Sequence, residues 1–317
     1  MQKKLNKMSF FTKELENCCL CPRNCGVNRF TDKNGYCQSG VGFHISSICL
    51  HKGEEPALSG VEGICNVFFS HCNLQCLYCQ NHQISSCENT VENILTLDEV
   101  LEKITEFLKK GIHAVGFVSP SHMVSQVVQI VDGLRQRNYN PIFVWNSNAY
   151  DKPEILRKLE NYIDVYLPDY KYVNSQIAKR YSDAENYPEV ALSAIKEMYY
   201  QKGSKLFLND DHQAEKGLII RHLVLPGKSE ESIEVLKTIA EEISTNVTIS
   251  LMSQYYPTEK VLHVDGLCKN ITESEYQKVV DALYELGFTN GWVQDYESES
   301  HYRPDFENNH PFESTKE

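Results

Sequence analysis

The feature that most restricts the fold is a repeated alternation of short apolar stretches and helical stretches from about residue 66 onward. Several of the apolar stretches are hydrophobic nearly throughout, which is typical of strands that are covered on both faces. Such an alternation predicts a parallel sheet with right-handed crossover helices. The predicted strands are 66–70, 113–119, 141–147, 163–169, 217–227 and 246–256. The predicted helices are 96–111, 121–137, 152–160, a region up to about 202, 230–244 and 272–286.

The first of these helices is predicted to begin after Thr96 as its N-cap and to stop at Gly111. Six strand–helix units are fewer than the eight of a closed barrel. The pattern alone allows an open partial barrel or a doubly wound sheet, and in both the functional residues gather at the carboxyl ends of the strands. We divide the chain into a cysteine-rich N-terminal extension (1–63), an α/β core (64–290) and a polar C-terminal tail (291–317) that lies over the surface or is disordered.

Three closely spaced cysteines follow the first predicted strand, in the stretch HCNLQCLYCQ at residues 71–80. A structural zinc site and an electron-transfer [4Fe–4S] cluster both normally take four protein ligands. Cys72, Cys76 and Cys79 could instead hold a cubane cluster at three irons and leave the fourth iron for a small molecule. A molecule with an amine and a carboxylate, such as S-adenosylmethionine, could chelate that iron.

The composition bounds the cellular setting and the partners. The net charge is −12, which disfavours binding to the nucleic-acid backbone. The sequence has no apolar run that is long enough for a signal peptide or a membrane span, so we expect a cytoplasmic protein. Metal or iron–sulfur ligation explains clustered cysteines in such a compartment better than disulfides do. The isolated cysteines are predicted to be core thiols, and they are Cys49, Cys65, Cys87 and Cys268.

The stretch CNLQCLYCQN, with its aromatic residue before the third cysteine, resembles the signature of radical S-adenosylmethionine enzymes. Together with CPRNCGVNR and HKGEEPALSG it resembles an uncharacterised iron–sulfur subfamily similar to pyruvate formate-lyase activating enzyme. The resemblance implies a partial (βα)6 barrel and a [4Fe–4S] cluster on Cys72, Cys76 and Cys79. It also implies an oxidoreductase that reductively cleaves S-adenosylmethionine to give a 5′-deoxyadenosyl radical.

The same resemblance implies partners. The radical could activate a glycyl radical enzyme, or it could modify a metabolite or a peptide, and a flavodoxin or ferredoxin would supply electrons. A protein that only binds an iron–sulfur cluster or zinc is the alternative from another class. An open loop of three cysteines is a poor fit to that alternative.

Further residues are assigned cofactor contacts by the resemblance. Tyr78 is expected against the adenine. The second strand ends VSPSHMV in place of the family's Gly-Gly-Glu, so backbone carbonyls are expected to accept from the methionine amine, with Ser121 or His122 assisting. Lys171 is expected to pair with the cofactor carboxylate as a point charge. Arg221 lies mid-strand and needs an anionic partner, either that carboxylate or Asp169. The assigned residues are Tyr78, Ser121, Asn146, Asp169, Lys171 and Arg221.

The N-terminal extension carries a second group of cysteines with the spacing C-x2-C-x3-C-x11-C. Cys18, Cys21, Cys25 and Cys37 suit a second iron–sulfur cluster or a structural zinc. His51, Glu54 and Glu55 in HKGEEPALSG belong to the family signature. Their spacing supports no particular role, and a solvated loop is an equal expectation for them.

Overall fold

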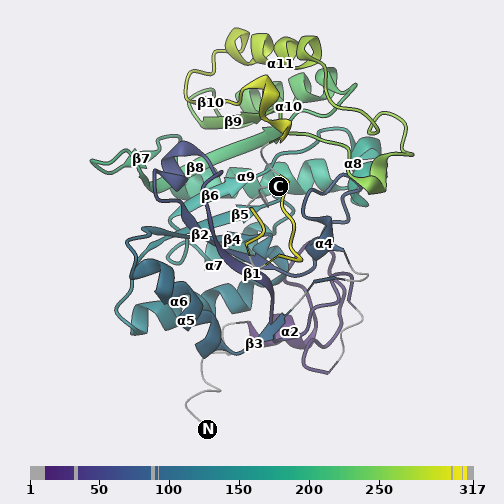
Figure 1. Cartoon of the computed structure of the whole chain (residues 1–317). Coiled ribbons are helices and arrows are strands. Elements are labelled where there is room, and N and C mark those ends of the chain that lie inside the picture. Colours follow the sequence, from purple (N-terminus) through teal and green to yellow (C-terminus); the bar gives the residue numbers. More distant parts are fainter. Residues whose placement is uncertain are drawn as a thin grey trace.

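The computed structural model describes residues 11–31, 35–86, 90–91, 93–300, 303–308 and 310–312. Its centre is a ten-stranded sheet in the order β10-β9-β8-β6-β5-β4-β2-β1-β3, with β7 paired to β8 (Figure 1). The strands are β1 (Phe43–His51), β2 (Ile64–Phe69), β3 (Asn93–Leu95), β4 (Ala114–Val118), β5 (Ile142–Ser147), β6 (Val165–Pro168), β7 (Phe207–Leu208), β8 (Ala214–Leu223), β9 (Thr248–Met252) and β10 (Gly291–Val293).

The neighbouring strands along the path from β10 to β2 are parallel, and they are β10, β9, β8, β6, β5, β4 and β2. Strand β1 is antiparallel to both of its neighbours, β2 and β3. The described parts of the edge strands β3 and β10 do not pair with each other, so the sheet is an open, partial barrel. The six predicted strands are confirmed as β2, β4, β5, β6, β8 and β9. Three further strands of the path, β1, β3 and β10, were not predicted. Two of these lie outside the predicted core of 64–290: β1 in the extension and β10 just after residue 290.

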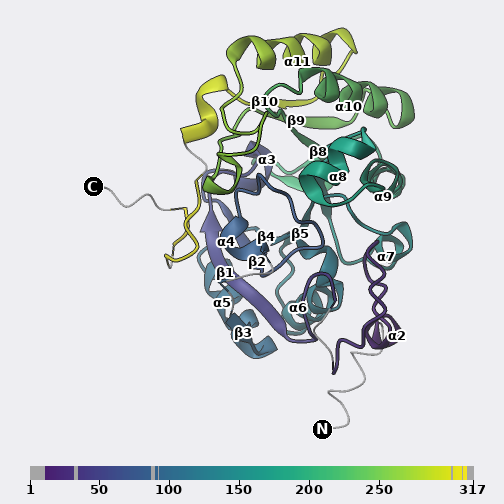
Figure 2. The ribbon, with the colours of Figure 1, turned by 90° about the vertical axis from the view of Figure 1, so that its right-hand side faces the viewer.

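Helices cover the outer face of the sheet (Figure 2). They are α5 (Leu97–Leu108), α6 (Val124–Gln136), α7 (Pro153–Lys158), α8 (Ser175–Ser182), α9 (Tyr187–Lys202), α10 (Ser229–Glu242) and α11 (Glu273–Glu285), and shorter helices are α2 (Thr12–Glu16), α3 (Pro56–Ser59) and α4 (His82–Ser85). Thr96 is the N-cap of α5, as predicted, and the structure shows that it forms a capping box with Glu99. Successive residues of a strand face opposite sides, so Phe143 and Trp145 of β5 pack in the main core while Val144 faces inward.

The short helix α3 closes the inner face of the barrel at the amino ends of the strands. Its residues Ala57 and Leu58 pack against inward-facing residues of the parallel strands, among them Val144, Val165 and Ile219. Because β1 is antiparallel to β2 and His51 pairs with Ile64, the turn from β1 into α3 lies at the amino end of β2. The barrel is therefore closed at that end by residues 52–59 and is polar at the other.

The N-terminal extension is docked onto the core by buried and charged contacts. Lys158 of α7 forms an ion pair with Glu14 of α2. Arg29 is buried and donates hydrogen bonds to the carbonyls of Ser39, Gly40 and His122. Since one guanidinium joins two turns of the extension to the loop before α6, the extension packs as part of the same body.

The described residues of the C-terminal tail also pack on the sheet, as Figure 2 shows beside β1. Phe306 contacts Phe68 with ring centroids 5.1 Å apart, and Phe312 lies 4.1 Å from the His51 ring. The prediction that the tail lies over the surface therefore holds for this part. No helix in the described ranges has the length and apolar character needed to cross a membrane.

The isolated cysteines divide between the core and the surface. Cys49 and Cys65 are buried, as predicted, whereas Cys268 is exposed. The prediction for Cys268 is wrong because this residue lies in a polar loop ahead of α11 rather than on a core-facing position. Cys87 lies outside the described residues.

Candidate functional site

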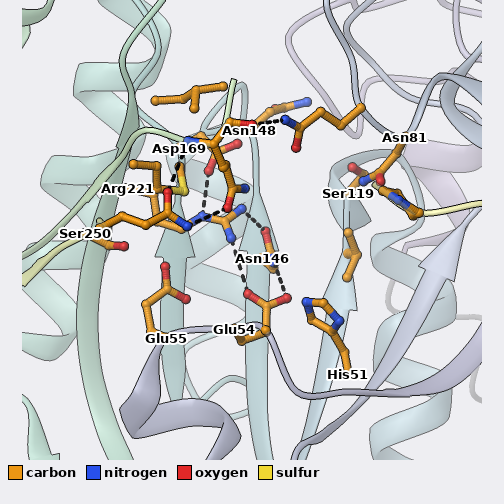
Figure 3. Close-up of a pocket in the computed structure, with 18 of the residues that line it drawn as sticks. His51, Glu54, Glu55, Asn81, Ser119, Asn146, Asn148, Asp169, Arg221 and Ser250 are labelled. Carbon is orange, nitrogen blue, oxygen red and sulfur yellow. Dashed lines mark hydrogen bonds and ion pairs between the residues drawn. The ribbon is translucent and has the colours of Figure 1, made fainter. Parts of the chain in front are cut away.

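A cavity of 640 Å³ opens at the carboxyl ends of the strands and extends into the barrel. Its lining joins the cysteine loop to inward-facing residues of β2, β5, β8 and β9 (Figure 3). Cys72, Cys76 and Cys79 all line this cavity. The parallel topology explains this placement, because the loop after a strand of such a sheet lies at its carboxyl edge.

Each sulfur of the loop accepts a hydrogen bond from a neighbouring polar group. Cys72 Sγ accepts from Asn148 Nδ2 at 3.3 Å and from the Leu74 amide at 3.4 Å. Cys76 Sγ accepts from the Ser182 hydroxyl at 3.0 Å, and Cys79 Sγ accepts from a serine hydroxyl of α4 at 3.2 Å. Donors around sulfur stabilise its negatively charged form, so the surroundings suit thiolate ligands.

Two free thiols of the loop, those of Cys72 and Cys76, are nevertheless held protonated. Burial raises the pKa of Cys72 to about 12 and that of Cys76 to about 11. Metal ligation requires the thiolate, so a positively charged iron centre must displace these protons when it binds. The described part of the chain has no group of three or more Cys, His, Asp or Glu side chains arranged around a single metal ion. The loop suits a cluster on other grounds: its three sulfurs open onto one cavity, and each accepts a hydrogen bond that favours the thiolate.

The predicted pair Asp169 and Lys171 lies on the cavity wall beside the cysteines. Lys171 Nζ is 2.7 Å from Asp169 Oδ2, and Arg221 Nε is 2.7 Å from Asp169 Oδ1. Burial opposes the charge on Asp169, but Arg221 and Lys171 hold the pKa of its carboxyl below the ordinary value. Burial also opposes the charge on Lys171, and Asp169 more than compensates, so the pKa of its amine is raised. Asp169 is thus the anionic partner that Arg221 was predicted to need.

The guanidinium of Arg221 has two further partners deeper in the barrel. Its Nη2 donates to Asn146 Oδ1 at 2.7 Å, and its Nη1 lies 3.3 Å from Glu54 Oε2. Asn146 in turn donates to Glu54 at 3.3 Å, and Asn66 donates to the same carboxylate at 2.9 Å. Asn146 therefore lines the cavity with an amide already engaged by two side chains.

A glycine makes room for this network. A Cβ atom on Gly116 would lie 2.1 Å from Asn66 Oδ1, which is closer than any real contact allows. Gly116 of β4 is paired with Asn66 of β2 in the sheet register. A side chain at 116 would force Asn66 away from Glu54, so the buried carboxylate would lose a donor.

Tyr78 and Ser121 have different surroundings. Tyr78 lines the cavity, and its hydroxyl is hydrogen-bonded to that of Tyr172. Ser121 is buried beside Asp151 and does not line the cavity, so it is not placed to hold a cofactor there. Ser119 lines it instead, in a left-handed conformation with φ 53°. A single 3-10 turn from Pro120 directs the following side chains inward to the protein core.

Sequence reasoning missed the acidic residues of the turn before α3. Glu54 and Glu55 line the cavity together with His51, and Glu55 is 7% exposed. The spacing of two adjacent glutamates before Pro56 gives no sign of a buried site and is equally typical of a solvated loop. The one signal in the sequence was the apolar turn PALS that follows them, which anchors this segment inside the barrel.

The N-terminal cysteines form a separate group. Cys18, Cys21 and Cys37 are buried, Cys25 is partly buried, and none of the four lines the cavity. The Tyr36 amide donates to Cys25 Sγ at 3.2 Å, and backbone amides two residues on also donate to Cys18 and Cys21. Such amide donors are suited to thiolate ligands. Burial nonetheless raises the pKa of Cys18 and of Cys21, so ligation would have to displace their protons as well.

Comparison with known proteins identifies the family. Residues 66–239 match the model of the Radical SAM superfamily. The uncharacterized protein MJ0674 of Methanocaldococcus jannaschii is 29% identical over 273 residues, which cover 84% of this chain and 74% of that protein. The crystal structure of HydG, a maturase of the [FeFe]-hydrogenase, matches with a TM-score of 0.50 and 14% identity over 72% of this chain.

This chain spans 51% of HydG, and at such low identity HydG bears on the fold alone. The family match is to the superfamily as a whole, so the narrower resemblance to pyruvate formate-lyase activating enzyme stays a prediction. The superfamily's [4Fe–4S] cluster and S-adenosylmethionine agree with the chemistry of the loop at 72–79. Because the family model covers more than half of the sequence and the fold agrees with it, this chain belongs to the radical SAM superfamily.

Proposed function

We propose that this chain is an enzyme that holds a [4Fe–4S] cluster on Cys72, Cys76 and Cys79 and cleaves S-adenosylmethionine reductively. One observation carries the proposal: three thiols open onto a cavity in which no fourth cysteine of the described chain takes part. An iron without a protein ligand would therefore face the cavity and the charged pair Asp169 and Lys171.

A cluster bound at Cys72, Cys76 and Cys79 would supply the electron for reductive cleavage of the sulfonium, which would give methionine and a 5′-deoxyadenosyl radical. Lys171 offers an ammonium to the cofactor carboxylate, and Asp169 keeps that ammonium charged and oriented. Ser119 supplies polar atoms near the predicted amine position, and Tyr78 forms an aromatic wall held by Tyr172. Asn148 and Ser182 fix the sulfurs that they hydrogen-bond.

The test is anaerobic reconstitution with iron and sulfide, followed by an assay for 5′-deoxyadenosine with dithionite and S-adenosylmethionine. We expect formation of 5′-deoxyadenosine by the native chain and none by the variant with alanine at Cys72, Cys76 and Cys79. The matched control is Cys268→Ala, an exposed cysteine far along the chain, which should retain full turnover. Turnover by the triple variant would refute the assigned ligands, and a reconstituted cluster that never yields 5′-deoxyadenosine would refute the reaction.

We also propose that Cys18, Cys21, Cys25 and Cys37 hold a second metal centre, either an iron–sulfur cluster or zinc. Four thiols in one segment, three of which accept hydrogen bonds from backbone amides, support a fully ligated site. Iron and zinc analysis of the triple variant of the cysteine loop reports on this centre alone. Absence of both metals from that variant would contradict the second site.

The use of the radical is a further part of the proposal. The resemblance of the cysteine loop to that of pyruvate formate-lyase activating enzyme supports abstraction of hydrogen from a glycyl radical enzyme or another peptide, with a flavodoxin or ferredoxin as electron donor. Electron paramagnetic resonance of a mixture with a glycyl radical enzyme would show a glycyl radical if this use is right. A spectrum without that radical, recorded from a mixture that does form 5′-deoxyadenosine, would instead favour another substrate.

A further inference from the structure

We propose that the inner end of the cavity binds a primary ammonium group of the substrate, with Glu55 as its counter-ion. The inference rests on the proposed function, since it names the chemistry of the molecule that the radical would attack. It concerns a different end of the cavity from the cysteine loop, and a binding measurement can test it separately.

The position of Glu55 places it across the barrel from the cluster loop. The cysteine loop follows the carboxyl end of β2, whereas Glu55 lies in the turn at the amino end of that strand. Figure 3 shows Glu54 and Glu55 rising from this turn toward Arg221 and Ser250. All four line the same cavity, so a molecule held at Glu55 lies inside the barrel, on the inner side of the Asp169 and Lys171 pair.

Glu55 has no ion-pair partner among the described residues that line the cavity, although the Ser250 hydroxyl donates a hydrogen bond to it. Arg221 and Lys171 are engaged by Asp169 and Glu54, and the remaining lysine of the lining, Lys52, is exposed. No cationic side chain in the described ranges lies within ion-pair distance of Glu55, and its Oε2 atom accepts no hydrogen bond from the residues that the structure describes. A carboxylate that is 7% exposed is costly to leave unpaired. A ligand cation would supply the missing charge.

The neighbouring wall suits an ammonium group. Arg221, Ser250 and Trp292 are partners in the register of β8, β9 and β10, and all three line the cavity. Residues in register on neighbouring parallel strands face the same side, so the Trp292 ring lies on the same cavity wall as the Ser250 hydroxyl, which is hydrogen-bonded to Glu55. An indole face attracts an ammonium through its quadrupole, and the effect grows when the group is desolvated.

The titration of Glu55 agrees with a site that is filled by a cation. Burial raises the pKa of its carboxyl to about 7, with Arg221 opposing the shift and Glu54 adding to it. His51 faces the same cavity and is kept neutral, because burial lowers the pKa of its ring. Without ligand, Glu55 is therefore about half ionised at neutral pH, and a bound ammonium would favour the ionised form.

The experiment uses the full chain, anaerobically reconstituted and saturated with S-adenosylmethionine, and n-butylammonium as the probe. Ligand-observed NMR measures its dissociation constant beside those of the neutral n-butanol and the anionic butyrate. We expect binding of n-butylammonium only, and an affinity that rises about tenfold from pH 6 to pH 8 as the carboxyl ionises. Glu55→Gln should weaken this binding at least tenfold, while the exposed control Glu285→Gln should leave it unchanged.

Trp292→Leu is the second variant, because it leaves the carboxylate in place should Glu55→Gln fold poorly. It should weaken n-butylammonium binding several-fold. Equal affinity in the native chain and in Glu55→Gln, or equal binding of butanol and butylammonium, would overturn the inference. Because the readout is binding, loss of S-adenosylmethionine cleavage with amine binding intact would count against the proposed function alone.

Discussion

The two cysteine-rich segments of this protein differ in what their sulfurs face. The loop with Cys72, Cys76 and Cys79 directs three thiols to a 640 Å³ cavity, whereas the N-terminal group of Cys18, Cys21, Cys25 and Cys37 has no residue in the cavity lining. The segment with three cysteines faces the cavity, and the segment with a fourth spaced cysteine does not. A site that must accept a small molecule keeps a position open and exposed to the cavity, and a structural site is closed by a fourth thiol and buried.

The two segments are nevertheless in contact. Arg23, between two of the N-terminal cysteines, donates from Nε to the Asn73 carbonyl at 2.8 Å, next to Cys72. Its guanidinium also lies 3.7 Å from the centroid of the Tyr36 ring. The N-terminal segment thus braces the three-cysteine loop through residues that do not line the cavity.

The largest effect is expected from Cys76→Ala, which breaks the open loop. The cubane would lose one of three protein ligands, so 5′-deoxyadenosine formation should fall to background. Product analysis by chromatography after dithionite addition measures it, with Cys268→Ala as control. Retained turnover would mean that the open site lies elsewhere.

A smaller and different effect is expected from Cys21→Ala in the closed segment. The second metal should be lost, and the melting temperature should fall, because a structural metal contributes its binding energy to folding. Cleavage of S-adenosylmethionine should fall less than tenfold, since the cavity lining is untouched. Metal analysis and thermal unfolding measure the first two effects, and the neighbouring Cys19→Ala is the control. If cleavage were lost as completely as in Cys76→Ala, the proposal that only the 72–79 loop holds the catalytic cluster would be wrong.

The third prediction concerns the cation beside the open loop. Lys171→Ala should weaken binding of S-adenosylmethionine about tenfold or more, because a charged hydrogen bond to its carboxylate is lost. Iron content should stay near that of the native chain. Equilibrium binding and iron analysis check both statements, and Lys179→Ala on the surface of α8 is the control. Collapse of the iron content would give Lys171 a structural role.

The smallest effect is expected from Arg23→Ala, which removes the brace between the segments. The change deletes hydrogen bonds to the Asn73 and Asp183 carbonyls. We expect the melting temperature to fall by about 2–4 °C for a loss of about 1 kcal/mol. Metal content should be unchanged in both segments. An unchanged melting temperature would show that the two segments are independent.

Much of the fold was predictable because it depends on local pattern. Each of the six predicted strands and the N-cap at Thr96 followed from residues within one element. The predictions were weakest where pairing is long-range. β1 and β10 are short or half-polar and owe their place in the sheet to the strands that they pair with.

The candidate site shows the same division. Cys72, Cys76 and Cys79 stand close in sequence, so their joint role was readable from spacing. Ser121 was expected at the cofactor, but the turn at Pro120 buries it and puts Ser119 on the cavity wall. Ser119 rather than Ser121 reaches the cavity because the backbone of Ser119 is left-handed, and residue type alone does not predict that conformation.

The amino-acid sequence by itself determined the chemistry of the loop and the class of the fold, because ligand spacing and apolar periodicity act over a few residues. Only the tertiary structure decided which charges meet inside the barrel. Glu54 is 167 residues from Arg221, yet the two are ion-paired, and Glu55 beside them has no ion-pair partner among the described residues. The reason is physical: a buried charge is stabilised or penalised by neighbours that chain topology brings together, and no local pattern records them.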